Sequence, residues 1–169
     1  FKRHNRFQVL AAMNTGDYDK VLALVEESEK KTDNPVEQCN NFYRKGYIHF
    51  EKGEFDKLPH IVREYEALKR KHPKIAHVFN SYTVFDKFDA FADEDYEYVI
   101  GVCDIDLKEL NPKNQNHKLT KINVSFYRAV SLYMMGDMDG AKKAFEGIIE
   151  YAPKVHKAKL AREYLNKMN

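Results

Sequence analysis

The histidines are the side chains best suited to chemistry in this sequence, because a neutral imidazole can ligate zinc or exchange a proton near neutral pH. A zinc-dependent protease holds its metal with two histidines one helical turn apart, in the pattern HExxH. The sequence contains neither that pattern nor any pair of histidines four residues apart. We therefore expect no metal site, no cofactor and a structural role for all seven: His4, His49, His60, His72, His77, His117 and His156.

Asp104 and Asp106 begin a pattern that is typical of a calcium-binding loop, which places carboxylates at alternate positions. The sixth position of such a loop needs a glycine for its sharp turn, and the twelfth needs a bidentate glutamate. Those two positions hold Glu109 and Gln115. The sequence therefore argues against a calcium site.

The motifs of the common enzyme classes are missing from the sequence. It has no GxSxG nucleophile elbow, no phosphate-binding P-loop and no GxGxxG dinucleotide motif. The acidic run at residues 93–95 indicates a solvated turn, because nothing pairs it into an acid–base site. Cys39 and Cys103 form no CxxC pattern, so we expect two reduced, buried thiols. These observations favour a protein that is not an enzyme.

Charge and hydropathy exclude two classes of partner for this segment. The formal net charge is only +2, and no run of 18 apolar residues occurs. We therefore predict neither nucleic-acid binding nor insertion into a membrane by this segment. A basic cluster follows Phe1, however: Lys2, Arg3, His4 and Arg6. One hypothesis is a transmembrane tether upstream of Phe1, which would hold a cytoplasmic domain at the cytoplasmic face of the membrane. The alternative is a solvated first helical turn or the rim of a pocket.

The stretch from Ile122 to Pro153 predicts two amphipathic helices that pack as an antiparallel hairpin. One helix ends near Met135 and the next begins near Met138, with Gly136 supplying the positive φ of a tight turn. Small residues at Ala129 and Ala141 let the two backbones approach, and larger apolar residues fill the seam. The stretch resembles a tetratricopeptide repeat, whose pattern is W-x2-L-G-x2-Y, A-x3-F and P. The residues that carry the resemblance are Ser125, Arg128, Ala129, Leu132, Ala141, Phe145 and Pro153.

The turn between those helices recurs along the chain. Residues 16–19, 53–56 and 136–139 share the order glycine, acid, apolar residue, acid, and residues 94–97 form a degenerate copy without the glycine. Asn34, Pro35 and Glu37 predict another helix start, with Asn34 as the cap and Glu37 reaching back toward it. Gly46 occupies the glycine position of the repeat pattern, where the missing side chain lets two helices pack closely.

The resemblance implies an all-α fold, a right-handed α-α superhelix built as one domain over residues 1–169. We expect about four antiparallel helical hairpins plus a C-terminal capping helix. The hairpins are predicted at about 2–31, 35–71, 73–110 and 118–153, and the capping helix at 154–168.

In such a stack the first helices of the hairpins line a concave face, where partner peptides bind. Projecting the helical period predicts an aromatic groove on this face, and the alternative is that these side chains are ordinary core. Members of the family that grip a terminal carboxylate use Lys, Asn and Arg here. Only Arg6, Asn40, Arg44 and Asn123 are available, and their spacing argues against that ligand. The predicted groove residues are Tyr43, Tyr47, Phe50, Phe85, Phe88, Phe126, Tyr127 and Tyr133.

The function predicted from the sequence is a non-catalytic module for protein–protein interaction. It would bind a peptide, a partner helix or a second copy of the chain as a homodimer. The alternative is a ligand- or peptide-sensing regulatory domain fused to a DNA-binding segment.

Overall fold

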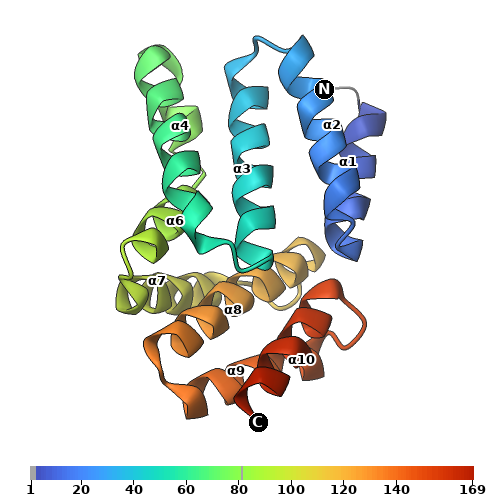
Figure 1. Ribbon diagram of the computed structural model, residues 1–169, viewed down its shortest axis with the longest axis vertical. Coiled ribbons are helices and arrows are strands. Elements are labelled where there is room, and N and C mark those ends of the chain that lie inside the picture. Colours follow the sequence, from blue (N-terminus) through green and yellow to red (C-terminus); the bar gives the residue numbers. More distant parts are fainter. Residues whose placement is uncertain (1–2, 81) are drawn as a thin grey trace. The chain divides into compact units, whose positions relative to one another are not determined.

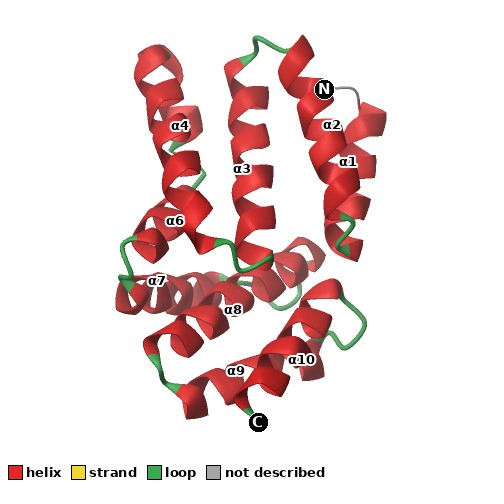
Figure 2. Cartoon of the chain, viewed as in Figure 1, coloured by secondary structure: helices red, strands yellow, loops and turns green. Residues whose placement is uncertain are grey.

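The computed structural model of the protein describes residues 3–80 and 82–169. This part of the chain is helical and contains no strand, which confirms the prediction of an all-α fold (Figures 1 and 2). Its α-helices are α1 (Arg3–Thr15), α2 (Tyr18–Lys31), α3 (Pro35–Glu51), α4 (Leu58–Lys71), α5 (Ala76–Phe79), α6 (Val84–Ala92), α7 (Tyr96–Glu109), α8 (Gln115–Met135), α9 (Met138–Tyr151) and α10 (His156–Met168). Two short 3-10 helices, Phe55–Lys57 and Pro73–Ile75, precede α4 and α5.

The helices form two compact units, where the sequence predicts a single domain. The first unit ends at Asp93 and the second runs from Glu94 to Asn169. In the first, α1 packs on α2, α2 on α3, and α3 and α6 on α4. In the second, α8 packs on both α7 and α9, and α10 covers α9. The boundary falls inside the predicted hairpin 73–110, so its two helices belong to different units.

The repeated turns take the backbone conformation that the sequence predicts. Gly16, Gly53 and Gly136 have φ angles of 75°, 72° and 89°. Glu94 has φ 60° and takes the place of glycine in the degenerate fourth copy. This left-handed conformation is unusual for a residue with a Cβ atom, which explains why glycine stands at the other three turns.

An aspartate after three of these turns caps the next helix. The side chains of Asp17, Asp95 and Asp137 accept hydrogen bonds from backbone N–H groups in the first turns of α2, α7 and α9. These bonds satisfy donors that a helix start leaves unpaired, and the carboxylates lie at the positive end of each helix dipole. At Gly53 the connection differs, because the 3-10 turn Phe55–Lys57 comes before α4 and no side chain caps it.

The sequence predicts one hairpin over residues 73–110, but the first helix of that hairpin is interrupted. The structure has α5 and α6 instead, and the backbone N–H groups of Tyr82, Phe85 and Asp86 close local turns between them. Asn80 and Thr83 stand in this break. Both residue types have a low helix propensity, a signal that hydrophobic periodicity alone does not include.

Aromatic side chains dominate the core of each unit. In the first, Tyr65 stacks on Phe85 with ring centroids 3.9 Å apart, and Phe50 meets Phe91 edge to face at 5.0 Å. In the second, Tyr164 of α10 stacks on Phe145 of α9 at 4.8 Å, so the predicted capping helix does cover the last hairpin. Cys39 and Cys103 are fully buried thiols, as predicted.

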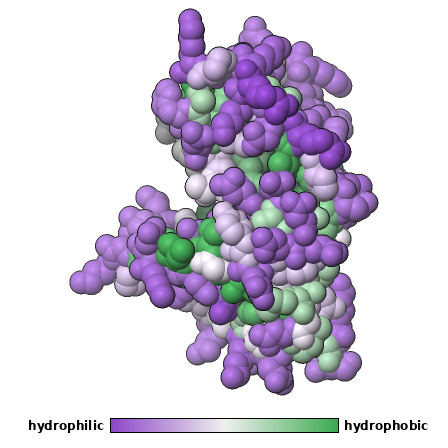
Figure 3. Space-filling model, turned by 90° about the vertical axis from the view of Figure 1, so that its left-hand side faces the viewer, coloured by the Kyte–Doolittle hydropathy of each residue, from purple (hydrophilic) through white to green (hydrophobic). Residues whose placement is uncertain are grey.

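The surface is mainly hydrophilic on the face that Figure 3 shows, with apolar side chains exposed in smaller areas. None of the helices in the described ranges is long and apolar enough to span a membrane. The large apolar residues exposed in that part of the chain are Phe7, Leu10, Tyr98, Ile105, Leu119, Met134, Met135, Met138 and Tyr151.

Candidate binding site on helix α3

Most of the aromatic residues predicted to line an open groove are core residues. Phe50 packs among Phe55, Phe88 and Phe91, and Phe126 lies against Phe145. These side chains are therefore not an exposed aromatic lining. They are part of the ordinary core, which was the alternative. The period of a helix shows which face is apolar but not which neighbour covers it. Two of the eight, Tyr43 and Tyr133, are half-buried, and the others are buried: Tyr47, Phe50, Phe85, Phe88, Phe126 and Tyr127.

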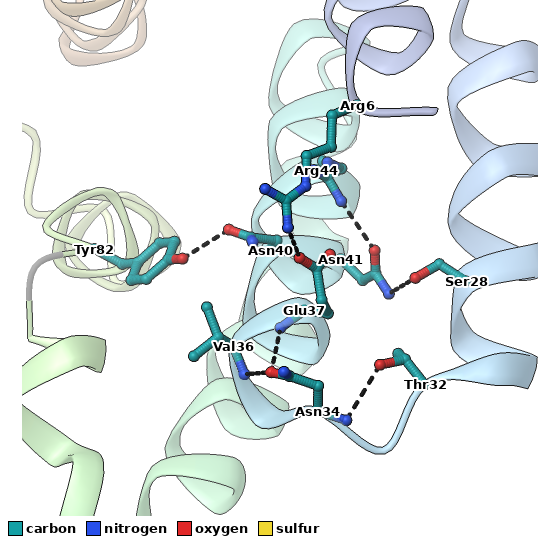
Figure 4. Close-up of polar contacts among 10 residues, drawn as sticks. All are labelled: Arg6, Ser28, Thr32, Asn34, Val36, Glu37, Asn40, Asn41, Arg44 and Tyr82. Carbon is teal, nitrogen blue, oxygen red and sulfur yellow. Dashed lines mark hydrogen bonds and ion pairs between the residues drawn. The ribbon is translucent and has the colours of Figure 1, made fainter. Parts of the chain in front are cut away.

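A polar face lies along the N-terminal half of α3 instead. Glu37, Asn40, Asn41 and Arg44 follow one another at helical spacing, so their side chains leave the same side of the helix (Figure 4). Other parts of the first unit add polar groups to this face. Figure 4 shows Arg6 reaching in from α1, Ser28 from α2 and Tyr82 from the segment before α6.

Asn34 is the N-cap of α3, so it fixes where the helix that carries this face begins. Its side-chain oxygen accepts hydrogen bonds from the backbone N–H groups of Val36 at 2.9 Å and Glu37 at 3.4 Å, as the sequence predicts. The reciprocal bond does not form, because the Asn34 N–H donates to the Thr32 hydroxyl at 3.1 Å (Figure 4). The Glu37 carboxylate is therefore left for a tertiary contact.

Glu37 makes that contact with Arg6. The Arg6 Nη2 atom donates to Glu37 Oε1 at 2.7 Å, a charge-assisted hydrogen bond between α3 and α1. Only 7% of the Glu37 side chain is exposed, against 60% for Arg6. The other carboxylate oxygen, Oε2, is buried and has no hydrogen-bond partner among the described residues. A buried acceptor in this state calls for a donor from water or from a ligand.

Arg44 brings a second guanidinium to the same face. Burial lowers the pKa of Arg44, and the nearby Glu37 carboxylate opposes that change. Its Nη1 atom donates to Asn41 Oδ1 at 3.2 Å, and the Asn41 amide donates to Ser28 Oγ at 3.0 Å. These bonds fix the direction of both side chains. Two cations thus flank one carboxylate, which leaves the face with a net positive charge.

Asn40 offers a side-chain amide between these charged groups. Its Oδ1 atom accepts a hydrogen bond from the Tyr82 hydroxyl at 2.7 Å. Burial is also the main reason that the pKa of Tyr82 is raised, which keeps this hydroxyl a donor. The Asn40 nitrogen donates no hydrogen bond to any of the described residues. Because Asn40 is only partly buried, its amide is open to an incoming group.

The arrangement brings together three of the four polar residues that the sequence offered for gripping a carboxylate. Arg6, Asn40 and Arg44 share this face, whereas Asn123 belongs to α8 in the second unit. Sequence reasoning missed Glu37 and Tyr82 as members: it assigned Glu37 to a helix start, and it gave Tyr82 no role beyond its place in the hairpin 73–110. The polar residues at 37, 40 and 44, which recur at helical spacing along α3, are the signal that could have found it.

Comparisons with known proteins identify no relative. No family model matches the sequence, and neither a curated protein nor a solved structure matches it significantly. Within the described ranges, no cluster of His, Cys, Asp and Glu side chains is placed to hold a metal ion.

Proposed function

We propose that this chain is a non-catalytic interaction module, which binds a peptide segment of a partner protein on the polar face of α3. The observation that carries the proposal is the convergence of Arg6, Asn40 and Arg44 around the buried carboxylate of Glu37. These side chains come from two helices, and hydrogen bonds hold several of them in fixed directions. Binding sites typically hold a few polar groups in this way.

The chemistry of the face suits a peptide better than a simple anion. An extended peptide presents both N–H donors and C=O acceptors. The Asn40 amide can donate to a carbonyl, and the guanidinium groups can donate to carbonyl or carboxylate oxygens. Glu37 Oε2 can accept from an N–H or an ammonium group. A bare anion would use the donors and leave that acceptor without a partner.

The repeated hairpins support the same proposal. We infer that they are tetratricopeptide-like repeats stacked in a superhelix. The support is a turn with positive φ that recurs four times between helices, three times at a glycine and once at Glu94. In that family the first helix of each hairpin faces the partner. Helix α3 is the first helix of the second hairpin, and the polar face lies on it.

A selection from a displayed library of random 12-residue peptides tests this function. Peptides that bind the wild-type chain would be retested by fluorescence polarisation against the double variant Arg6→Ala/Asn40→Ala. We expect at least one selected peptide whose Kd rises at least tenfold in the variant, which corresponds to about 1.4 kcal/mol of binding free energy. Selection of no peptide, or equal Kd values, would contradict the proposal.

Two controls separate binding from folding in this experiment. Arg63→Ala/Arg70→Ala removes two charges from exposed positions of α4, one more than the test variant removes, and should leave the Kd unchanged. Tyr82→Phe removes the hydrogen bond to Asn40 but keeps the Asn40 amide. If Tyr82→Phe weakens binding as much as Arg6→Ala/Asn40→Ala does, the effect is structural and Asn40 does not contact the peptide.

A further inference from the structure

A groove in the second unit lies between α7, α8 and α9, and it shares no residue with the polar face of α3. Its volume is about 320 Å³, at the lower end of the range for ligand pockets and suited to one or two inserted side chains. Leu107, Ile122 and Ile148 give it an apolar lining from all three helices.

Small residues leave the α9 side of the groove open. Ala144 and Gly147 line it, and a Cβ atom placed on Gly147 would meet no atom within 4 Å. The glycine is exposed, in the middle of a helix where it costs stability relative to alanine. The space over Gly147 is therefore available to a side chain that comes from another molecule.

The charged residues of the groove differ in how they are paired. Arg128 donates from Nε to Asp104 Oδ1 at 2.7 Å, so each of these groups has a partner. Lys121 places its ammonium 4.0 Å from the centre of the Tyr151 ring. No carboxylate in the described part of the chain forms an ion pair with Lys121. The groove thus has a net positive charge, and Lys121 is a cation without an ion pair among the described residues.

An equivalent groove in the first unit has the opposite charge. It lies between α2, α3 and α4 and has a volume of about 410 Å³. When the turns at Gly53 and Gly136 are aligned, Gln38 corresponds to Lys121 and Glu64 corresponds to Gly147. Two acids, Glu29 and Glu64, and one cation, Lys71, line the first groove. An acidic ligand is therefore favoured by the second groove and disfavoured by the first.

We propose that the groove between α7, α8 and α9 binds an acidic segment of a partner protein. A large apolar side chain of that segment enters the space over Gly147 and contacts Ile122 and Ile148. A neighbouring Asp or Glu of the segment pairs with the Lys121 ammonium. This site is additional to the face of α3, so the chain offers two separate contacts for partner proteins.

The test uses the full chain and a displayed library of random 12-residue peptides, with the variant Gly147→Leu as the counter-selecting protein. The Cβ atom of a leucine at this position meets no atom within 4 Å, the rest of its side chain enters the groove, and leucine favours the helix, so the variant should fold. We expect the selected peptides to combine an Asp or Glu with a large apolar residue. Their Kd, measured by fluorescence polarisation, should rise at least tenfold in Gly147→Leu and in Lys121→Glu.

Matched variants assign the binding to this groove. Gly101→Leu makes the same substitution at an exposed glycine of α7 that also has no neighbour within 4 Å. Lys143→Glu makes the same charge change on an exposed lysine of α9. Both should leave the Kd unchanged, as should Arg6→Ala/Asn40→Ala, which tests the site on α3 separately.

Several results would overturn the proposal. They are the selection of no peptide, the selection of peptides without acidic residues, and a Kd that is equal in wild type and Gly147→Leu. A loss of binding in Arg6→Ala/Asn40→Ala would move the contact to α3. A concentration-dependent dimer that Gly147→Leu dissociates, seen by light scattering, would make a second copy of the chain the occupant instead.

Discussion

The guanidinium of Arg6 on α1 lies 2.7 Å from the carboxylate of Glu37 on α3, so that one ion pair connects the first two hairpins of the first unit. The pair is asymmetric, because Glu37 is buried and Arg6 is mostly exposed. The carboxylate depends on this cation, since a buried charge without a partner is costly. The same contact directs Arg6 toward the face that we propose as the binding site.

Replacing Arg6 by alanine should therefore destabilise the chain. We expect the free energy of unfolding, measured with urea, to fall by about 1–2 kcal/mol, less than for a fully buried pair because solvent screens Arg6. The double variant Arg6→Ala/Glu37→Gln should recover part of the loss, because it removes the unpaired charge. Equal stability of the wild type and Arg6→Ala would show that the pair contributes nothing.

Gly46 should tolerate no side chain. A Cβ atom at this position would come within 2.7 Å of Phe88 and 3.2 Å of Ile61, and the Phe88 ring is fully buried. We expect Gly46→Ala to lower the free energy of unfolding by about 1–2 kcal/mol, since overpacking outweighs the gain in helix propensity. Gly101→Ala, at an open helical position, should instead raise it by up to about 1 kcal/mol. Thermal unfolding of the two variants gives the comparison, and a stabilised Gly46→Ala would show that the helices can separate.

Phe126 should act through stability and not through direct contact with a partner. Its ring is fully buried and lies against Phe145 and Tyr164. We expect Phe126→Ala to lower the free energy of unfolding by about 3–5 kcal/mol. If urea unfolding showed a loss below about 1 kcal/mol while partner binding disappeared, the predicted aromatic groove would regain support at this position.

Glu51 should make stability fall as the pH rises. Burial raises the pKa of Glu51 to about 8, against about 4.3 in an unfolded chain. Between these values the folded state holds a proton that the unfolded state has released. The contribution is thus fully present below about pH 4.3 and is lost as the pH rises toward 8, by up to about 1.4 kcal/mol per pH unit.

The variant Glu51→Gln isolates this contribution, because glutamine keeps the shape of the side chain and does not titrate in this range. Urea unfolding of wild type and variant at pH 5, 6, 7 and 8 gives the two pH profiles. The difference in the free energy of unfolding between them should change steadily with pH. Parallel profiles would mean that Glu51 is ionised in the folded chain at all four values.

The turns and most helices of this fold could be predicted from the sequence, because the deciding information is local. Positive φ needs glycine, and an aspartate one residue later caps a helix, so the turns at Gly16 and Gly136 follow from a few adjacent residues. The fourth turn, in which Glu94 stands in place of glycine, could also be predicted, because the residues after it follow the order acid, apolar residue, acid. The break between α5 and α6 escaped prediction, because the low helix propensity of Asn80 and Thr83 is a weaker signal than the apolar periodicity around them.

The candidate site was only partly predictable, because it depends on contacts between distant segments. The sequence named Arg6, Asn40 and Arg44 as available polar groups, but their spacing argued against a terminal carboxylate as the ligand. The structure brings Arg6 to α3 through Glu37, which is 31 residues away. Burial of Phe50 and Phe126 likewise depends on helices that lie elsewhere in the chain.

The most direct test of the proposed function is a quantitative pull-down from a lysate of the source organism, read out by mass spectrometry. Four baits would be compared at equal folded fraction: the wild type, Arg6→Ala/Asn40→Ala, Arg63→Ala/Arg70→Ala and Tyr82→Phe. We predict that at least one protein is captured by the wild type and by the last two variants, and is lost with Arg6→Ala/Asn40→Ala. Capture of the same proteins by all four baits, or of none by the wild type, would contradict binding on the polar face of α3.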